Sequence, residues 1–350
     1  MKSSSRWARH FVRVVRGLAI AYPLALLGVV IALRFIGEDW WATTVGLYLP
    51  AVGYALPLLP IALLIALSKE KRLFWTLPVA VALLLFPLLG LSLSTGGGHD
   101  DGRPRWRVLS FNVNSGHGGQ ELIEQEISRH APDLVLLQES DFGREKLLEL
   151  LKEKYPFVVV STQFVTASRH PIVETTEPDR LPYGDKLRSP RFVRHVVESP
   201  LGRVVVYNVH PLSPRESLAA VRGQGLREEL RSGRLLSGAN RRVVEDNVGL
   251  RRLQVEAIGR AVRAETLPVV VGGDTNLPHG SALFARNWGQ LRDGFAEAGN
   301  GFGFTFPNRL AFLRLDRILA TETLDFVSFE VDCGQVSDHR CVVAELEKAD

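Results

Sequence analysis

The sequence predicts an α/β domain that is preceded by three membrane-spanning helices. Residues 1–100 contain three long apolar runs of about 20 residues, the length of helix that crosses a bilayer core of about 30 Å. Residues 101–350 instead alternate short apolar, strand-like runs with amphipathic helical stretches, as in an ordinary α/β domain. The 350 residues leave room for about two domains.

The apolar runs cover residues 18–36, 47–67 and 73–93, and they define a predicted membrane domain over residues 1–93. Each run contains proline, which would break a helix in water, but neighbouring helices of a bundle can satisfy the carbonyl groups that proline frees. The first run is too long for the apolar part of a cleaved signal peptide, and two more runs follow it.

The distribution of charge predicts the orientation of these helices. Basic residues precede the first run and dominate the loop Lys69–Arg72, whereas the loop at residues 37–41 is acidic and aromatic. The positive-inside rule places basic loops in the cytoplasm. We therefore expect a multi-pass protein of the cell (inner) membrane with a cytoplasmic N-terminus, a linker at residues 94–104 and an extracytoplasmic domain at residues 105–350.

The soluble region shows a regular succession of elements. Apolar or alternating runs predict strands, and residues spaced for one helical face predict helices. The expected strands lie at residues 107–111, 134–137, 157–160, 192–198, 203–208, 269–271, 314–319, 327–331 and 342–346, and the expected helices at residues 121–129, 144–154 and 249–263.

Charge is unevenly divided between the two regions. Residues 1–100 hold nine Lys and Arg against four Asp and Glu, whereas the remaining residues hold 33 against 34. The basic excess of the chain therefore belongs to its membrane region and does not indicate an acidic partner. Residues 213–263 are an exception, with eleven Arg against six acidic residues, and residues 214–247 of this segment are expected to form an insertion beside the site. It is either a solvated helix face with a mobile loop or a contact for phosphate groups of substrate or membrane.

The chain has two cysteines, Cys333 and Cys341, too few for a disulfide framework or a zinc ribbon. They form one bridge if that end of the chain lies outside the cytosol, or they are two small buried thiols.

One strand ends in an informative group of residues. The β-branched run Val269–Val271 is followed by Gly272 and Gly273, which allow a close backbone approach, and then by Asp274 and Asn276. A carboxylate and a carboxamide two residues apart beyond a rigid strand suit a hard cation or a phosphate. The alternative is a plain Asx turn.

The same placement recurs along the chain. Polar residues that bind cations or move protons lie at the end of an apolar strand-like run, just beyond one or, for Asp316, within one: Asn112, Glu139, His210, Asp274, Asn276, Asp316, Asp338 and His339. A single such residue is an ordinary turn former, but so many placements of these types favour a shared site.

These residues occur in short pieces that together resemble the endonuclease/exonuclease/phosphatase superfamily, which includes DNase I-like nucleases. The pieces follow the family's order and cover residues 105–347: Phe111-Asn112, Gln138-Glu139, Ser168-Arg169-His170-Pro171-Ile172, Asn208-Val209-His210, Gly273-Asp274-Thr275-Asn276, Arg314-Leu315-Asp316 and Ser337-Asp338-His339. The resemblance implies a two-sheet α/β sandwich of the DNase I type, with the site at the strand ends between the sheets. It also implies Mg²⁺-dependent phosphoester hydrolysis, with Mn²⁺ as a substitute.

On this resemblance, the metal ligands are expected to be Glu139, Asp338 and Asn112, because Mg²⁺ prefers oxygen ligands. Asp274 and Asn276 would position the attacking water and a phosphoryl oxygen, and Asp274 is a candidate general base.

The remaining roles fall to two histidines and their partners. Asp316 would bond a ring nitrogen of His339, fix its tautomer and raise its pKa, so that His339 contacts the phosphate or the water. His210 would stabilise the charge that develops in transfer, and Arg169 would clamp the phosphate in a bidentate manner.

Two positions depart from the pattern of the family. Arg317 stands where many relatives carry an aromatic residue or His, and the sequence shows no acidic partner that would orient His210.

The function expected from the sequence is a membrane-anchored, Mg²⁺-dependent phosphoesterase that cleaves phosphodiester or phosphomonoester bonds outside the cytoplasm. A lipid-linked or small phosphoester is the favoured substrate, because a nuclease acting on duplex DNA usually presents a basic face. The alternatives are a membrane-tethered nuclease and a non-catalytic membrane receptor on the same fold. The expected partners are the phosphoester and the lipid bilayer, with nucleic acid for the nuclease alternative; no protein partner is evident.

Overall fold

The computed structural model describes residues 2–94, 102–220 and 239–349. The chain forms two compact units, which we describe separately: residues 1–91 with 279–282, and residues 92–278 with 283–350. Most of the expected linker and much of the expected insertion at residues 214–247 lie outside the described residues.

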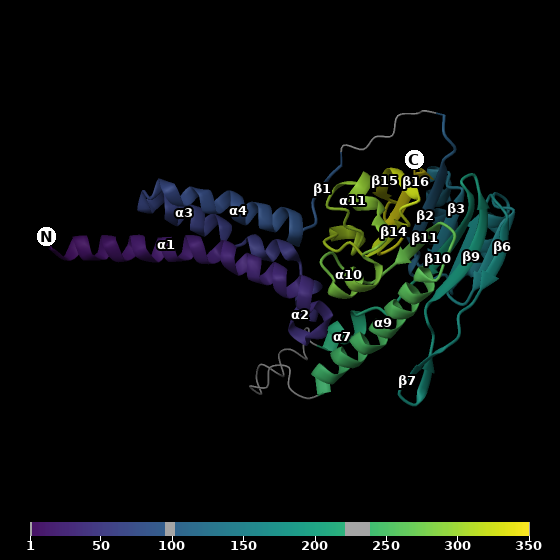
Figure 1. Cartoon of the computed structure of the whole chain (residues 1–350), viewed down its shortest axis with the longest axis horizontal. Coiled ribbons are helices and arrows are strands. Elements are labelled where there is room, and N and C mark those ends of the chain that lie inside the picture. The colour runs from purple at the N-terminus through teal and green to yellow at the C-terminus, as the bar shows by residue number, and fades with distance from the viewer. Residues whose placement is uncertain (1, 95–101, 221–238, 350) are drawn as a thin grey trace. The chain divides into compact units, whose positions relative to one another are not determined.

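The first unit consists of apolar helices. Helix α1 (Lys2–Ile31) packs against α3 (Leu58–Ser68) and α4 (Thr76–Leu83) through a buried stripe that includes Ala19, Ile65 and Ala80 (Figure 1). Three helical stretches, Arg6–Asp39, Ala51–Ser68 and Lys71–Leu88, are long and apolar enough to cross a membrane. The expectation of three such helices is thereby met in length and composition.

The boundaries of these helices differ from those expected. The second stretch begins after Pro50 rather than at residue 47, because Trp41–Leu47 forms a separate short helix, α2, before that proline. The third stretch ends at Leu88, since Gly90 adopts a left-handed φ of 72°, and Ser92–Leu93 form the short strand β1. Strand β1 pairs with β13 (Asn300–Gly301).

The second unit contains two six-stranded sheets, which confirms the predicted two-sheet α/β sandwich (Figure 1). The first sheet has the order β15 (Leu324–Asp332), β16 (Cys341–Lys348), β2 (Trp106–Asn112), β3 (Leu134–Gln138), β5 (Phe164–Ser168), β4 (Phe157–Ser161). The second has the order β12 (Arg292–Asp293), β14 (Asp316–Ala320), β11 (Val269–Asp274), β10 (Gly202–Val209), β9 (Phe192–Ser199), β6 (Ile172–Thr176). A separate hairpin joins β7 (Leu181–Tyr183) to β8 (Lys186–Arg188).

Alternation along the strands fills three apolar layers. Val204 and Val206 of β10 point into the core between the sheets, whereas Val205 and Tyr207 point to the outer face of their sheet. Helices α9 (Ala239–Arg263) and α10 (Ala282–Trp288) cover that outer face, and α5 (Gln120–His130) and α6 (Arg144–Lys152) cover the outer face of the other sheet. Among the described residues, this unit also contains the shorter helices α7 (Arg215–Ala220) and α11 (Gly294–Ala298).

Parallel pairing brings the polar strand ends together. Strand β2 runs parallel to β3, and β10 runs parallel to β11, so each pair delivers its carboxyl ends at one edge of its sheet. Two fully buried amides join the sheets just below this edge. Gln138 Nε2 donates to Asn208 Oδ1 at 2.8 Å, and Asn208 Nδ2 donates to the carbonyl of Leu137 at 3.2 Å. A buried amide pair of this kind fixes the register of the two sheets.

Arg317, one departure from the family pattern, has a structural role here. It follows Asp316 on β14, so its side chain points to the opposite face, where it forms an ion pair with the buried Asp293 and lies over the ring of Phe284. Burial lowers the pKa of Arg317 to about 10, although Asp293 opposes this. Arg314 lies 3.5 Å from the same carboxylate.

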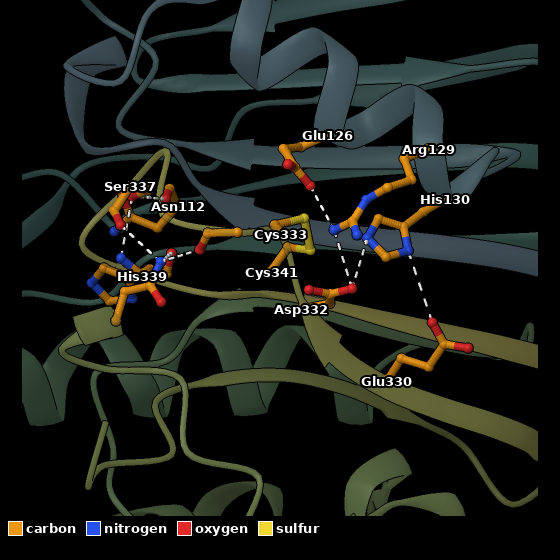
Figure 2. The surroundings of a disulfide bond; sticks show 12 residues. Asn112, Glu126, Arg129, His130, Glu330, Asp332, Cys333, Ser337, His339 and Cys341 are labelled. Carbon is orange, nitrogen blue, oxygen red and sulfur yellow. Dashed lines mark hydrogen bonds and ion pairs between the residues drawn. A yellow bond between two sulfur atoms is a disulfide. The ribbon is translucent and has the colours of Figure 1, made fainter. Parts of the chain in front are cut away.

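Cys333 and Cys341 form a disulfide, which settles whether they are bridged (Figure 2). The bond closes the connection between β15 and β16. Figure 2 shows it between Asn112, Ser337 and His339 on one side and an ion-pair network on the other. In that network Arg129 of α5 pairs with Glu126 at 2.6 Å and with Asp332 at 3.1 Å, which joins the helix to the end of β15.

Candidate active site

The polar residues expected from the sequence converge at the edge of the sandwich. Asn112 and Asp274 are the last residues of β2 and β11, and Glu139 and His210 come directly after β3 and β10. Asp316 is the first residue of β14, which runs antiparallel to β11 and places Asp316 opposite Asp274. Both sheets therefore contribute residues to one cluster.

Asp274 lies at the centre of this cluster and is 1% exposed. Its Oδ2 accepts hydrogen bonds from Asn112 Nδ2 at 3.1 Å and Asn276 Nδ2 at 3.3 Å. The same oxygen lies 3.5 Å from His210 Nε2 and 3.7 Å from His339 Nε2. Its other oxygen, Oδ1, accepts from the backbone N–H of Asn276 at 2.9 Å, so the carboxylate is fixed in orientation.

His339 is paired with two carboxylates. Its Nδ1 lies 2.9 Å from Asp316 Oδ2, as the sequence predicted, and its ring packs at 4.7 Å from that of Phe306. Burial alone would lower the pKa of His339, but Asp316 and Asp274 outweigh burial and raise it to about 10. Both ring nitrogens of His339 thus face a carboxylate, Nδ1 toward Asp316 and Nε2 toward Asp274, which favours the charged form of the ring.

The pKa of His210 is shifted in the opposite direction to that of His339. Its Nδ1 lies 2.6 Å from Gln163 Oε1, at the tip of the β4–β5 hairpin, and burial lowers its pKa to about 4. If the amide oxygen accepts the Nδ1 proton, then Nε2 directs a lone pair at Glu139 and Asp274, each 3.5 Å away. Two carboxylates around a neutral nitrogen favour a cation or a proton in this space.

Glu139 is held in an unusual backbone conformation, with φ of 51°. Its Oε1 accepts from Asn112 Nδ2 at 3.2 Å. Burial, and then the negative charge of Asp274, raise the pKa of Glu139. Left-handed backbone at a residue other than glycine costs free energy and is concentrated at functional sites.

Asp338 and two arginines border the opening of the cluster. Asp338 Oδ2 accepts from Arg215 Nη2 at 2.8 Å, and Arg215 lies over the ring of Phe306. A pocket of about 330 Å³ is lined by residues that include Glu139, His210, Arg191 and Arg215. Two guanidinium groups beside buried carboxylates and imidazoles suit an anionic substrate such as a phosphoester.

The donor set fits Mg²⁺. Glu139 and Asp338 offer carboxylate oxygens, which this ion prefers. Asp338 Oδ1 is buried without a hydrogen-bond partner among the described residues. Asn112 directs its amide nitrogen, rather than its oxygen, at the carboxylates, while its Oδ1 accepts from Asn114 at 3.0 Å. A ligand role for the Asn112 oxygen stays a prediction.

The structure does not bring Arg169 to this cluster. Arg169 follows β5, which is antiparallel to β3, so it lies beside the start of β3 rather than beside Glu139 at its end. Its guanidinium lies 3.9 Å from Asp133 Oδ1 and over the ring of Tyr155. The motif containing Arg169 therefore has a local structural role here, and Arg169 is not among our proposed phosphate ligands.

Two residues of this site, Gln163 and Arg215, were not predicted from the sequence. No local pattern could pair Gln163 with His210, because the contact joins a hairpin tip to a strand of the other sheet. Arg215 had a partial signal, since it lies in the Arg-rich segment. The position of Arg215 beside Asp338 favours phosphate contact for that residue.

Comparisons with known proteins agree with this architecture. The model of the Endonuclease/Exonuclease/phosphatase family matches residues 109–339. Among solved structures, an endonuclease/exonuclease/phosphatase from Beutenbergia cavernae DSM 12333 is 22% identical, with 71% of this chain and 72% of that one covered and a TM-score of 0.52. SmcL is 15% identical, with 70% and 99% covered and a TM-score of 0.51. Truncated TDP2 of Caenorhabditis elegans is 17% identical, with 69% and 98% covered and a TM-score of 0.50. A search of curated proteins gave no match. Likenesses at these identities show the fold, whereas the family model covers most of the soluble region, and the chain therefore belongs to the endonuclease/exonuclease/phosphatase family.

Proposed function

We propose that the chain is a membrane-anchored, Mg²⁺-dependent phosphoesterase whose active site is the cluster around Asp274. One observation carries the proposal. A buried carboxylate lies within 3.7 Å of the ring nitrogens of both His210 and His339, and these three residues come from separate segments of the chain. A structural carboxylate needs one cationic partner, whereas acid–base chemistry needs groups with different pKa values side by side.

Each residue of the cluster would have a separate role in hydrolysis. Asp274 would align the attacking water and accept its proton, helped by Asn276, which Asp274 itself orients. His339 would donate its Nε2–H to a phosphoryl oxygen, because Asp316 keeps the ring charged. His210, with its Nδ1–H directed at Gln163, would accept at Nε2 the proton that Asp274 takes from the water, and in this charged form would stabilise the charge that develops in transfer.

Glu139 and Asp338 would hold the metal, with Asn112 orienting Glu139 through its amide nitrogen. Bound Mg²⁺ would supply positive charge to the phosphoryl oxygens and reduce the repulsion between the substrate and the site. Arg215 would release Asp338 to the metal and contact the phosphate instead.

The test is Mg²⁺-dependent hydrolysis by the full chain in detergent, with Asp274→Asn and His339→Gln as variants. We expect each to lower kcat by at least about 100-fold, because each removes a group that transfers or stabilises charge. His195→Gln is the matched control: this buried histidine of β9 pairs with Thr175 at 2.9 Å and is not part of the cluster. A loss below about tenfold, or about 1.4 kcal/mol of transition-state stabilisation, would remove either residue from the catalytic core.

We infer that the substrate is a lipid-linked or small phosphoester. The support is the near balance of charge in the soluble region, together with three apolar helices that would hold the site near a bilayer. The test compares kcat/KM on phospholipid vesicles, small phosphomonoesters and duplex DNA at 0.15 M salt, with Asp274→Asn as the blank. Efficient DNA cleavage without turnover of vesicles or small esters would favour the tethered nuclease.

The orientation in the membrane is a further part of the proposal. The basic N-terminus and the basic second loop support a cytoplasmic N-terminus and a catalytic domain outside the cytoplasm. A C-terminal alkaline phosphatase fusion should then be active and a green fluorescent protein fusion dark. The reverse result would refute this orientation.

A further inference from the structure

The connection between β15 and β16 carries two of the proposed site residues. Residues 333–340 contain Asp338 and His339, and none of these eight residues belongs to a strand. A connection of this length does not fix its own conformation, so the geometry of the site depends on what binds it from outside. The structure provides such a contact in Asn308.

Asn308 is 5% exposed and forms several hydrogen bonds to the backbone of this connection. Its Nδ2 donates to the carbonyls of Gly334, Ser337 and His339 at 2.5, 3.0 and 3.3 Å. Its backbone N–H donates to the carbonyl of Asp338 at 2.7 Å. Both residues of the proposed chemistry are thus held through their own backbone.

The neighbouring groups determine which atom of the Asn308 amide is Nδ2 and which is Oδ1. Three carbonyl oxygens surround Nδ2, whereas Oδ1 accepts from Arg340 Nε at 3.2 Å, and Arg340 Nη2 donates to the carbonyl of Asn308 at 3.0 Å. Reversing the amide would place an oxygen against three oxygens. Asparagine is therefore suited to this position, since it combines a two-proton donor with an acceptor.

Few other contacts substitute for Asn308. Ser337 Oγ donates to the carbonyl of Asn112 at 2.7 Å, and the backbone N–H of Arg340 donates to Thr305 at 2.9 Å. The disulfide closes the ends of the connection but does not reach Asp338. Asn308 alone among these residues bonds to the backbone of both Asp338 and His339, as far as the described residues show.

We propose that Asn308 is a positioning residue of the active site, which fixes the loop carrying Asp338 and His339 and thereby sets the affinity of the site for Mg²⁺. This inference rests on the proposed role of Asp338 as a metal ligand. Asn308 touches neither metal nor substrate in this role and acts through the loop. Loss of a group that orients a metal ligand typically weakens metal affinity about 10–100-fold.

The experiment uses the full chain in detergent and two readouts. Calorimetric titration with Mg²⁺ alone measures affinity, and hydrogen–deuterium exchange without metal measures opening of residues 333–340. The variants are Asn308→Ala and the milder Asn308→Ser, which keeps one hydroxyl donor. Asn287→Ala is the matched control, because Asn287 is 9% exposed and its amide donates to Leu283 within α10, with no contact to the loop.

We expect Asn308→Ala to weaken Mg²⁺ binding by about tenfold or more and to speed exchange at residues 333–340 alone. Asn308→Ser should lie between Asn308→Ala and wild type, and Asn287→Ala should match wild type in both readouts. Mg²⁺ affinity within twofold of wild type, or faster exchange spread over the whole domain, would overturn the proposal. A wild-type chain that hydrolyses no phosphoester would refute the proposed function, and the exchange readout would still decide the role of Asn308.

Discussion

Reduction of the Cys333–Cys341 bond should destabilise the soluble unit by a measurable amount. The two cysteines lie eight positions apart in sequence, and both are fully buried. In the chain-entropy description, a crosslink closing a loop of this size removes about 2.5 kcal/mol of unfolded-state entropy at 25 °C. For a domain of about 150–250 residues, a loss of about 2.5 kcal/mol lowers Tm by about 5–10 °C.

Reduction of the disulfide should lower the stability of the domain more than its catalytic rate. Asn308 still holds the connection after reduction, and Arg129 still anchors Asp332 at the end of β15 just before it, so the native loop keeps most of its contacts. We therefore expect kcat of the reduced enzyme, measured well below Tm, to fall by less than about tenfold. Reduction combined with Asn308→Ala should lower the free energy of unfolding by more than the sum of the two separate losses. The reason is that neither the disulfide nor Asn308 then holds the connection.

The assay is thermal unfolding of the full chain in detergent, with and without a reductant that does not chelate metals. The double variant Cys333→Ala/Cys341→Ala is the control, since its Tm should be low and should not respond to the reductant. If wild type and the double variant unfold at the same temperature under oxidising conditions, the crosslink contributes nothing and the entropic argument is refuted.

Two further predictions concern histidines. Burial lowers the pKa of His195 to about 4, below its unfolded value of about 6.5, so this contribution to stability is complete above pH 6.5 and is lost as pH falls toward 4. The loss of stability amounts to at most about 3 kcal/mol. The variant His195→Gln should therefore show a smaller fall of Tm between pH 6.5 and 4 than wild type. An equal fall of Tm in both proteins would exclude His195 as the source of the pH dependence. Gln163→Leu should lower kcat about tenfold with little change in KM, because the ring of His210 then loses the partner of its Nδ1. Equal activity of Gln163→Leu and wild type would show that His210 needs no orientation.

The sequence predicted the elements of the sandwich well because its strands are short, apolar and ended by glycine or polar residues. Asn112 and Asp274 end strands of parallel pairs, which deliver their carboxyl ends to one edge of each sheet. Asp316 begins the antiparallel strand β14, and only the order of the family's motifs placed it in the site. The pairing of Asp316 with His339 followed from the same order of motifs and is present at 2.9 Å.

The predictions that were wrong or missing depend on strand direction and long-range contacts, which a pattern along the sequence does not contain. Arg169 follows a strand as Glu139 does, but β5 runs antiparallel to β3, and strand direction cannot be read from apolar runs. Gln163 and Asn308 act through contacts with residues that lie 47 and at least 26 positions away in sequence, in segments without regular periodicity. Helix α9 begins at Ala239, ten residues before the expected start, because its first turns carry few apolar residues.

The distribution of these contacts explains where a crosslink adds stability to this domain. Asn112, Asp274 and Asp316 lie on strands, and the buried pair of Gln138 and Asn208 fixes the two sheets beneath them. Asp338 and His339 instead lie in a connection between strands, where backbone entropy opposes a fixed geometry by about 1–2 kcal/mol per residue. The disulfide restricts that connection in the unfolded state, and Asn308 selects its native conformation in the folded state. A structural disulfide persists in an oxidising compartment, which agrees with the extracytoplasmic placement that we propose from the charges of the N-terminal loops.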